Sequence, residues 1–286
     1  MIKRILLLAA TLCTFSALAE EVKIGKCDTS QCKDYFNDYK RYAKSHIDAA
    51  AMLGDMYLNG YGTEIDKEEA LDAYMKAARW GSVLGRYKAG LLLLTSEDED
   101  DRDKGLTYLS DAAKRGHPNA IYFMGEVLSN DRYGFKNLEV ADDWIAASIK
   151  SQNRNVIYVL SRLNEEGVRN AEQMPLTVAA IERAPDSLFP GNESKELSAM
   201  RLPPEDSRFE VIEVNGPNLR EILDHGLALF KALPRDIHKK STGTRIRGRD
   251  CDDVFSCSSV PAENWQRFVA YSVRTPFEHA LWAARG

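Results

Sequence analysis

The feature that most constrains this chain is a repeat of about 35 residues. A fixed period in this range is typical of helix pairs that stack as a solenoid, because one pair cannot bury its apolar face alone. Small residues recur at this period, and they allow two helix backbones to approach closely. The intervals are 36 and 35 residues for Gly54, Gly90 and Gly125, and 35 and 34 residues for Ala78, Ala113 and Ala147.

The first repeat, residues 49–81, is the most complete. It predicts two short helices joined by a turn in which Gly60 and Gly62 supply backbone conformations with positive φ. Asp66 followed by Glu69 is a helix-start signal of the capping-box kind. Gly81 is expected to end the second helix, and Gly116 is expected to do the same in the next repeat.

These residues resemble the pattern of the Sel-one-like repeat family, which is related to the tetratricopeptide repeats. The resemblance covers about residues 46–167, as roughly three and a half repeats. It implies a mainly α fold, a right-handed α-solenoid, and a protein-interaction scaffold that holds a partner protein or an extended peptide in its groove. The structural repeat residues it implies are Gly54, Gly60, Gly62, Ala77, Ala78, Gly81, Gly90, Ala112, Ala113, Gly116, Gly125, Ala146 and Ala147.

Residues 1–19 have the pattern of a secretory signal peptide, with an amphipathic first helix as the alternative. Lys3 and Arg4 precede a short apolar run, and Ala17-Leu18-Ala19 forms a small-residue cleavage site. We therefore expect a periplasmic or secreted protein. Without the two basic residues of the signal, 36 Lys and Arg stand against 43 Asp and Glu, a net charge of −7. This balance argues against nucleic-acid binding, and no later stretch is long and apolar enough to span a membrane.

Four cysteines remain in the exported chain, and an even number there indicates disulfides. Three pairings are possible, and the two close pairs favour local bridges between Cys27 and Cys32 and between Cys251 and Cys257. The alternative is a metal site. The spacings of four and five intervening residues disfavour it, because zinc ribbons use two.

The remaining segments divide the chain further. Residues 20–45 are expected to form a capping helix, since Tyr35, Tyr39 and Tyr42 share one helix face; a ligand-stacking ladder is the alternative. Residues 168–207 are rich in proline and predict a connector. Residues 208–286 predict a smaller α or α+β module that resembles no family known to us.

Two charged runs lie outside the repeat pattern. The acidic run 97–101 is expected to be a solvated loop, and calcium binding is the alternative, although the spacing of an EF-hand is missing. Residues 235–249 concentrate positive charge, and Arg245, Arg247 and Arg249 alternate. They either form a solvated loop or dock an anionic surface through three guanidinium groups.

No nucleophile elbow, phosphate loop, zinc-hydrolase helix or dinucleotide fingerprint is present in the sequence. We therefore expect no catalytic residues, no cofactor and no resident metal. The favoured function is a non-enzymatic scaffold of the bacterial envelope, and the resemblance extends this to assembly of an envelope or flagellar-motor complex. The alternative is an envelope enzyme or enzyme regulator, related to the cell wall or to β-lactams, that acts through residues 208–286.

Overall fold

The structure is a computed structural model that describes residues 22–168, 171–189, 191–192, 194–202, 219–232 and 273–274. Within this part the chain is mainly helical. The helices are α1 Ser30–Tyr42, α2 Ile47–Asn59, α3 Lys67–Arg79, α4 Val83–Leu93, α5 Glu99–Lys114, α6 Pro118–Ser129, α7 Leu138–Lys150, α8 Val156–Glu165, α9 Pro175–Arg183 and α10 Leu219–Ala232, with 3-10 turns η1 Asp186–Leu188 and η2 Leu197–Ala199. Two short strands, β1 Val22–Lys23 and β2 Val273–Arg274, pair in parallel.

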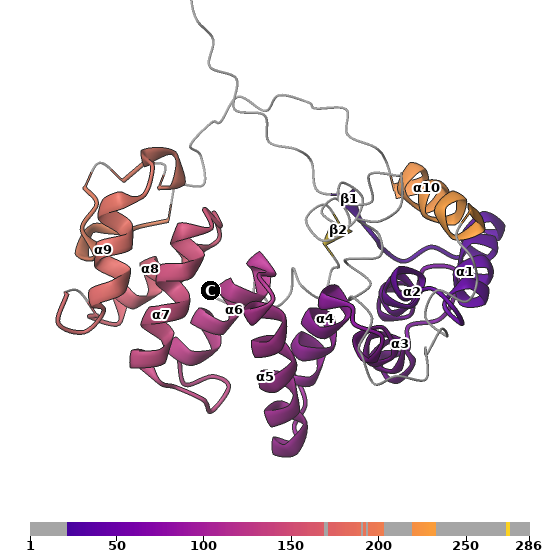
Figure 1. Cartoon of the computed structure of the whole chain (residues 1–286), viewed down its shortest axis with the longest axis horizontal. Coiled ribbons are helices and arrows are strands. Elements are labelled where there is room, and N and C mark those ends of the chain that lie inside the picture. Colours follow the sequence, from indigo (N-terminus) through magenta and orange to yellow (C-terminus); the bar gives the residue numbers. More distant parts are fainter. Residues whose placement is uncertain are drawn as a thin grey trace, which may run out of the picture.

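The helices stack in a curved row that runs from α1 at one end to α9 at the other (Figure 1). α2 pairs with α3, α4 with α5 and α6 with α7, and each pair packs on the next. α2, α4 and α6 form the inner layer, in which nearly every residue is buried. The solenoid of stacked helix pairs expected from the sequence is therefore confirmed.

Close backbone contact within the pairs explains the recurrent glycines. An added Cβ on Gly90 of α4 would lie 2.9 Å from the Leu109 backbone nitrogen and 3.0 Å from the Gly105 carbonyl oxygen of α5. On Gly54 it would lie 2.4 Å from the Tyr74 ring, and on Gly125 it would lie 2.7 Å from the Ile145 side chain. Each inner helix thus presents a glycine where its partner helix comes nearest.

Equivalent residues begin and end the helices of successive repeats. At the starts of α4 and α6, Ser82 accepts the amide of Gly85 at 2.9 Å and His117 Nδ1 accepts the amide of Ala120 at 3.2 Å. The residue before each of these caps has positive φ, which is 109° at Gly81 and 86° at Gly116. The third repeat lacks a closing glycine, and Gln152 takes the same left-handed conformation there with φ 55°. Such a conformation is uncommon for a residue with a side chain.

The imidazole of His117 is buried, and burial together with the positive charge of Lys88 lowers its pKa from 6.5 to about 3. Below pH 6.5 the unfolded chain binds a proton at this residue that the folded chain does not bind. Stability is therefore lost as pH falls, by about 2 kcal/mol between pH 7 and pH 5.

We expect His117→Asn to remove this loss, because asparagine caps a helix without titrating. In the next repeat Asn153 stands at the equivalent position and accepts the amide of Asn155 at 3.1 Å, in the turn just before α8, so asparagine is compatible with the backbone there. The measurement is urea denaturation of both proteins from pH 5 to pH 7. If the free energy of unfolding fell equally for wild type and variant between pH 7 and pH 5, His117 would not be the source of the pH dependence.

Buried and partly buried ion pairs join neighbouring repeats. The Lys88 ammonium of α4 lies 3.1 Å from the Asp55 carboxylate of α2, and the Tyr74 hydroxyl donates to the same carboxylate at 2.6 Å. Further along, Arg162 of α8 lies 3.4 Å from the Glu126 carboxylate of α6. Burial raises the pKa of Glu126, and the Arg162 charge opposes that rise. These pairs define the register in which one repeat packs on the next.

Helical packing continues beyond residue 167, where we expected the repeats to give way to a connector. α9 packs against α7, and its first amides donate to Asp142 of α7, at 2.8 Å from Leu176 and 2.7 Å from Thr177. α9 thus packs on the second helix of the third repeat, so the stacking of helices continues past residue 167. Pro175 stands at the first position of α9, where its missing amide costs nothing.

The acidic run expected as a loop lies mostly within a helix. Asp98 caps the start of α5 by accepting the amide of Asp100 at 2.8 Å, and Glu99, Asp100 and Asp101 occupy its first turn. Carboxylates at this end of a helix are stabilised by its macrodipole. In the described ranges no three His, Cys, Asp or Glu side chains gather as they would around a metal ion.

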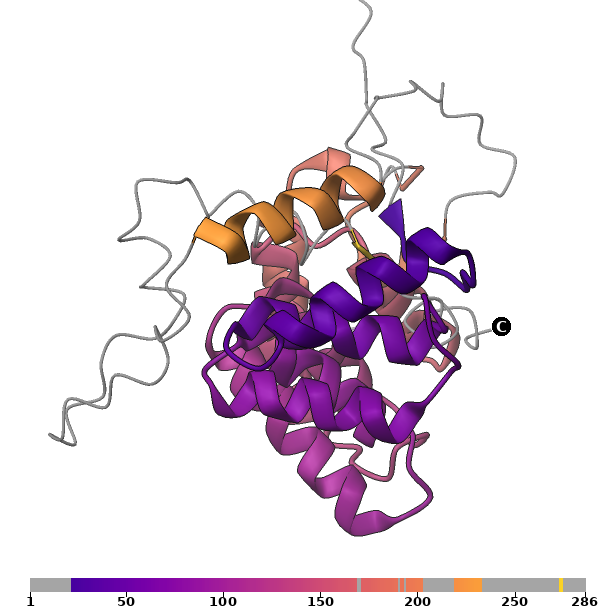
Figure 2. The same ribbon diagram turned by 90° about the vertical axis from the view of Figure 1, so that its right-hand side faces the viewer.

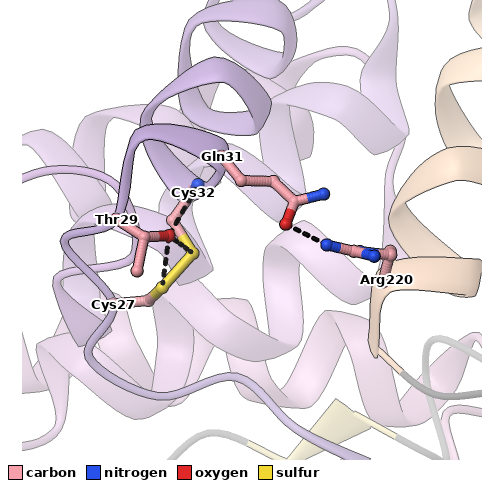
Figure 3. The surroundings of a disulfide bond; sticks show 5 residues. All are labelled: Cys27, Thr29, Gln31, Cys32 and Arg220. Carbon is pink, nitrogen blue, oxygen red and sulfur yellow. Dashed lines mark hydrogen bonds between the residues drawn. A yellow bond between two sulfur atoms is a disulfide. The ribbon is translucent and has the colours of Figure 1, made fainter.

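A disulfide joins Cys27, which precedes α1, to Cys32 in the first turn of that helix (Figure 3). Thr29, between the two cysteines, caps α1 by accepting the Cys32 amide at 3.3 Å. The same loop is hydrogen-bonded to the glycine turn of the first repeat. The Cys27 amide donates to the Gly60 carbonyl at 3.1 Å, and the Gly62 amide donates to the Cys27 carbonyl at 2.6 Å.

Candidate interaction groove

An open groove of about 1040 Å³ crosses the outer layer of the solenoid. α5 and α7 form its walls, and the buried side chains of Met124 and Leu128 from α6 form its floor. Val140 of α7 is 41% exposed at one edge. The residues that line this interaction groove are Asp103, Lys104, Leu106, Thr107, Tyr108, Ser110, Asp111, Lys114, Met124, Leu128, Val140 and Trp144.

Local structure explains why apolar side chains reach the surface here. Val140 and Trp144 are four residues apart, so both lie on one face of α7. Asn137 begins α7 by accepting the Val140 amide at 3.1 Å, which holds this first turn in place. On the facing wall, Leu106 is half-buried and packs against the core. The indole of Trp144 therefore lies half-buried between the two walls.

Two of the four charged residues that line the groove, Lys104 and Asp111, form ion pairs within the protein. Lys104 donates to Asp101 at 2.9 Å, and this hydrogen bond raises the pKa of Lys104 and lowers that of Asp101. Asp111 lies 2.6 Å from Arg86 and 3.4 Å from Arg115. The groove thus offers a ligand its apolar floor and walls, with Asp103 and Lys114 as further charged groups in its lining.

The groove has the composition of a binding surface. Among the described residues that line it there is no histidine or cysteine to serve as a general base or nucleophile. Burial of aromatic and aliphatic side chains supplies most of the energy at protein-binding surfaces, and tryptophan is enriched where that energy is concentrated. Trp144, Val140 and Leu106 are the residues of the groove best placed for such contacts.

Several residues expected from the sequence lie outside the described part of the chain. These are the signal segment, the second cysteine pair and the three alternating arginines. Of the expected C-terminal module, α10 and β2 are described. None of the helices that the structure describes combines the length and apolar character needed to cross a bilayer. The second cysteine pair outside the described part is Cys251 and Cys257, and the three arginines are Arg245, Arg247 and Arg249.

The sequence interpretation missed the interaction groove. It placed partner binding in an unspecified groove of the solenoid and at the arginines, and it did not single out Val140 or Trp144. Their four-residue spacing was visible in the sequence. However, Ile145, Ile149 and Ala146 share the same helix and are buried, so spacing alone does not show which apolar face is left uncovered.

No protein-family model matches the chain. One curated relative is the chitin synthase regulator SKT5 of Saccharomyces cerevisiae, which is 32% identical over 83 residues. That match covers 29% of this chain and 12% of the yeast protein. The chain thus spans about an eighth of the relative's length.

Solved structures similar to the chain include a Sel1 repeat protein from Oxalobacter formigenes, with 25% identity and a TM-score of 0.41 over 51% of this chain and 42% of that one. A protective antigen of uropathogenic Escherichia coli with an SLR fold has 18% identity and a TM-score of 0.42, over 53% and 37% of the two chains. An immunity protein from Pseudomonas aeruginosa has 17% identity and a TM-score of 0.25, over 57% and 80%. In its repeat residues and its stacked helix pairs, about half of the chain thus resembles Sel1-like repeat proteins.

Proposed function

We propose that this protein is an exported scaffold that binds a segment of a partner protein in the interaction groove. Solenoids present extended surfaces on which partner chains lie, and here an apolar groove opens on such a surface. The observation that carries the proposal is the apolar lining of the groove, in which Val140 is 41% exposed and Trp144 is half-buried. Isolated exposed apolar residues are ordinary, but a group of them lining a groove marks an interaction site.

The ligand that fits is a polypeptide segment with two or more apolar side chains. These would contact Trp144, Leu106 and the floor formed by Met124 and Leu128. Charged groups at the rim, Asp103 and Lys114, would select a segment that carries both a basic and an acidic residue beside its apolar ones. Such charges contribute more to orientation and association rate than to affinity.

Export is supported by two observations. Residues 1–19 have the composition of a signal peptide, and Cys27 and Cys32 are bonded, which suits an oxidising compartment. We therefore propose that the partner is a protein of the bacterial envelope, in which this scaffold assists assembly or regulation of a complex. A flagellar-motor complex is one such assembly.

The experiment is site-specific photo-crosslinking in living cells. A photoreactive amino acid at position 140 is expected to capture one discrete partner, and the product should be recovered from the periplasmic fraction. A probe at Leu176, which is 47% exposed on α9 but does not line the groove, is the matched control and should not capture that partner. Equal capture at both positions, or none at position 140, would contradict the proposal.

We further expect Val140→Gln to weaken capture of that partner, with the probe moved to Thr107 on the opposite wall. The valine is exposed enough for a polar side chain to leave folding intact, and glutamine removes apolar contact area. A loss of about tenfold in affinity corresponds to about 1.4 kcal/mol. Leu176→Gln makes the same change outside the groove, so it should leave capture unchanged, and a thermal melt confirms that both variants are folded.

A further inference from the structure

The tyrosine face of α1, formed by Tyr35, Tyr39 and Tyr42, is covered by a helix from far along the chain. α10 lies across α1 at the end of the solenoid opposite α9, as both views show (Figures 1 and 2). α10 is amphipathic: Leu223 and Phe230 are buried, whereas Asp224 and His225 are exposed. The apolar face of α10 thus packs on α1 in the way that an amphipathic helix packs in a binding groove.

The apolar part of the contact centres on Phe230. Its ring meets the Tyr39 ring edge to face at 5.7 Å, and it lies 5.8 Å from the Tyr42 ring. It also stacks on the His46 imidazole at 5.3 Å. Phe230 is 1% exposed, so one side chain of α10 fills a pocket whose walls come from α1 and the start of α2.

Polar contacts give the site a direction and a preference for a carboxylate. The Tyr35 hydroxyl donates to Asp224 at 2.7 Å, and the buried Tyr39 hydroxyl donates to the Leu223 carbonyl at 3.0 Å. Burial and the Asp224 carboxylate raise the pKa of Tyr35 to about 12, so its hydroxyl remains a donor at physiological pH. Arg220, near the start of α10, donates to Gln31 beside the disulfide (Figure 3).

α1 does not need α10 to stay on the solenoid. Its other side packs on α2, where Phe36 meets Tyr57 edge to face at 5.1 Å. The disulfide loop that begins α1 is tied separately to the glycine turn of the first repeat. In sequence, α10 is 184 residues from the Tyr39 that it contacts, and residues 203–218 separate it from the last described residue before it. Contact between such distant segments differs from the neighbour-to-neighbour packing of the repeats.

We propose that the tyrosine face of α1 is a binding site for an amphipathic helix, and that α10 is its built-in competitor. A partner helix with the same apolar spacing, and a carboxylate opposite Tyr35, displaces α10. The argument rests on the chemistry of the helix that already fills the site. It is independent of the interaction groove between α5 and α7.

The test uses the full chain and a fluorescent peptide of residues 217–234, the α10 sequence itself. Leu223→Asp places a carboxylate in the apolar contact and should release the tethered α10 without altering the repeats. Tethered α10 competes at a millimolar effective concentration, so the peptide should bind this variant at least about tenfold more tightly than wild type. Fluorescence anisotropy measures both affinities, and circular dichroism verifies that the variant is folded.

Four further variants make the result specific. Phe230→Ala releases α10 by a different change and should also admit the peptide. His225→Ala alters only the exposed face of α10 and should behave as wild type. Val140→Gln changes the interaction groove but leaves α1 intact, so it should also bind the peptide as wild type does. Adding Tyr35→Phe to Leu223→Asp should weaken peptide binding. Equal affinity for wild type and Leu223→Asp, or no binding to either released variant, would overturn the proposal.

Discussion

Asp55→Ala is expected to destabilise the protein by about 3–5 kcal/mol, the range found when one partner of a buried ion pair is removed. The substitution leaves the Lys88 ammonium buried at 4% exposure with its carboxylate gone. It also removes the acceptor of the Tyr74 hydroxyl, whose ring packs against Gly54. Chemical denaturation at pH 7 measures the loss.

The size of this loss depends on the charge left behind. The double variant Asp55→Ala with Lys88→Met should therefore be more stable than Asp55→Ala alone, because methionine fills the volume without a charge. Asp38 provides the matched control. It pairs with Arg41 on the surface of α1 at 2.7 Å, with the two side chains 36% and 62% exposed. Asp38→Ala should change stability by less than about 0.5 kcal/mol, and a loss as large as that of Asp55→Ala would contradict the argument from burial.

Gly90→Leu is expected to destabilise the solenoid by about 3 kcal/mol or more, at or above the top of the usual range for overpacking. The first side-chain carbon would already lie 2.9 Å from a backbone nitrogen of α5. A flexible side chain could move away, but backbone inside a helix cannot do so without separating α4 from α5. The melting temperature of the variant measures this effect.

A glycine without such neighbours separates overpacking from the general effect of adding a side chain. No atom lies within 4 Å of the position that a Cβ would take on Gly25, and its φ is not positive. Gly25→Leu should therefore leave the melting temperature nearly unchanged. If Gly90→Leu melted at the wild-type temperature, this result would contradict the close approach of the α4 and α5 backbones at Gly90.

Much of the fold could be predicted from the sequence because it is a local repeat. Gly60, Asp66 and Gly81 act through the conformation of their own backbone or through hydrogen bonds to residues a few positions away. The recurrence of a small residue about every 35 positions also indicates that the helices approach closely. Such signals need no knowledge of distant segments, and they were sufficient for the solenoid of helix pairs.

Tertiary structure alone decided where the surface is open and where it is covered. The shared face of Tyr35, Tyr39 and Tyr42 could be read from the sequence, but its contact with α10 could not, and neither could the packing of Phe36 on Tyr57 of the first repeat. Likewise, α9 could be placed against α7 only through its contact with Asp142, and Trp144 became a candidate only when α5 and α7 were seen to leave a groove. The physical reason is that helix periodicity identifies an apolar face but not its partner. The partner is selected by three-dimensional packing between residues that lie as much as 189 positions apart, as Tyr35 and Asp224 do.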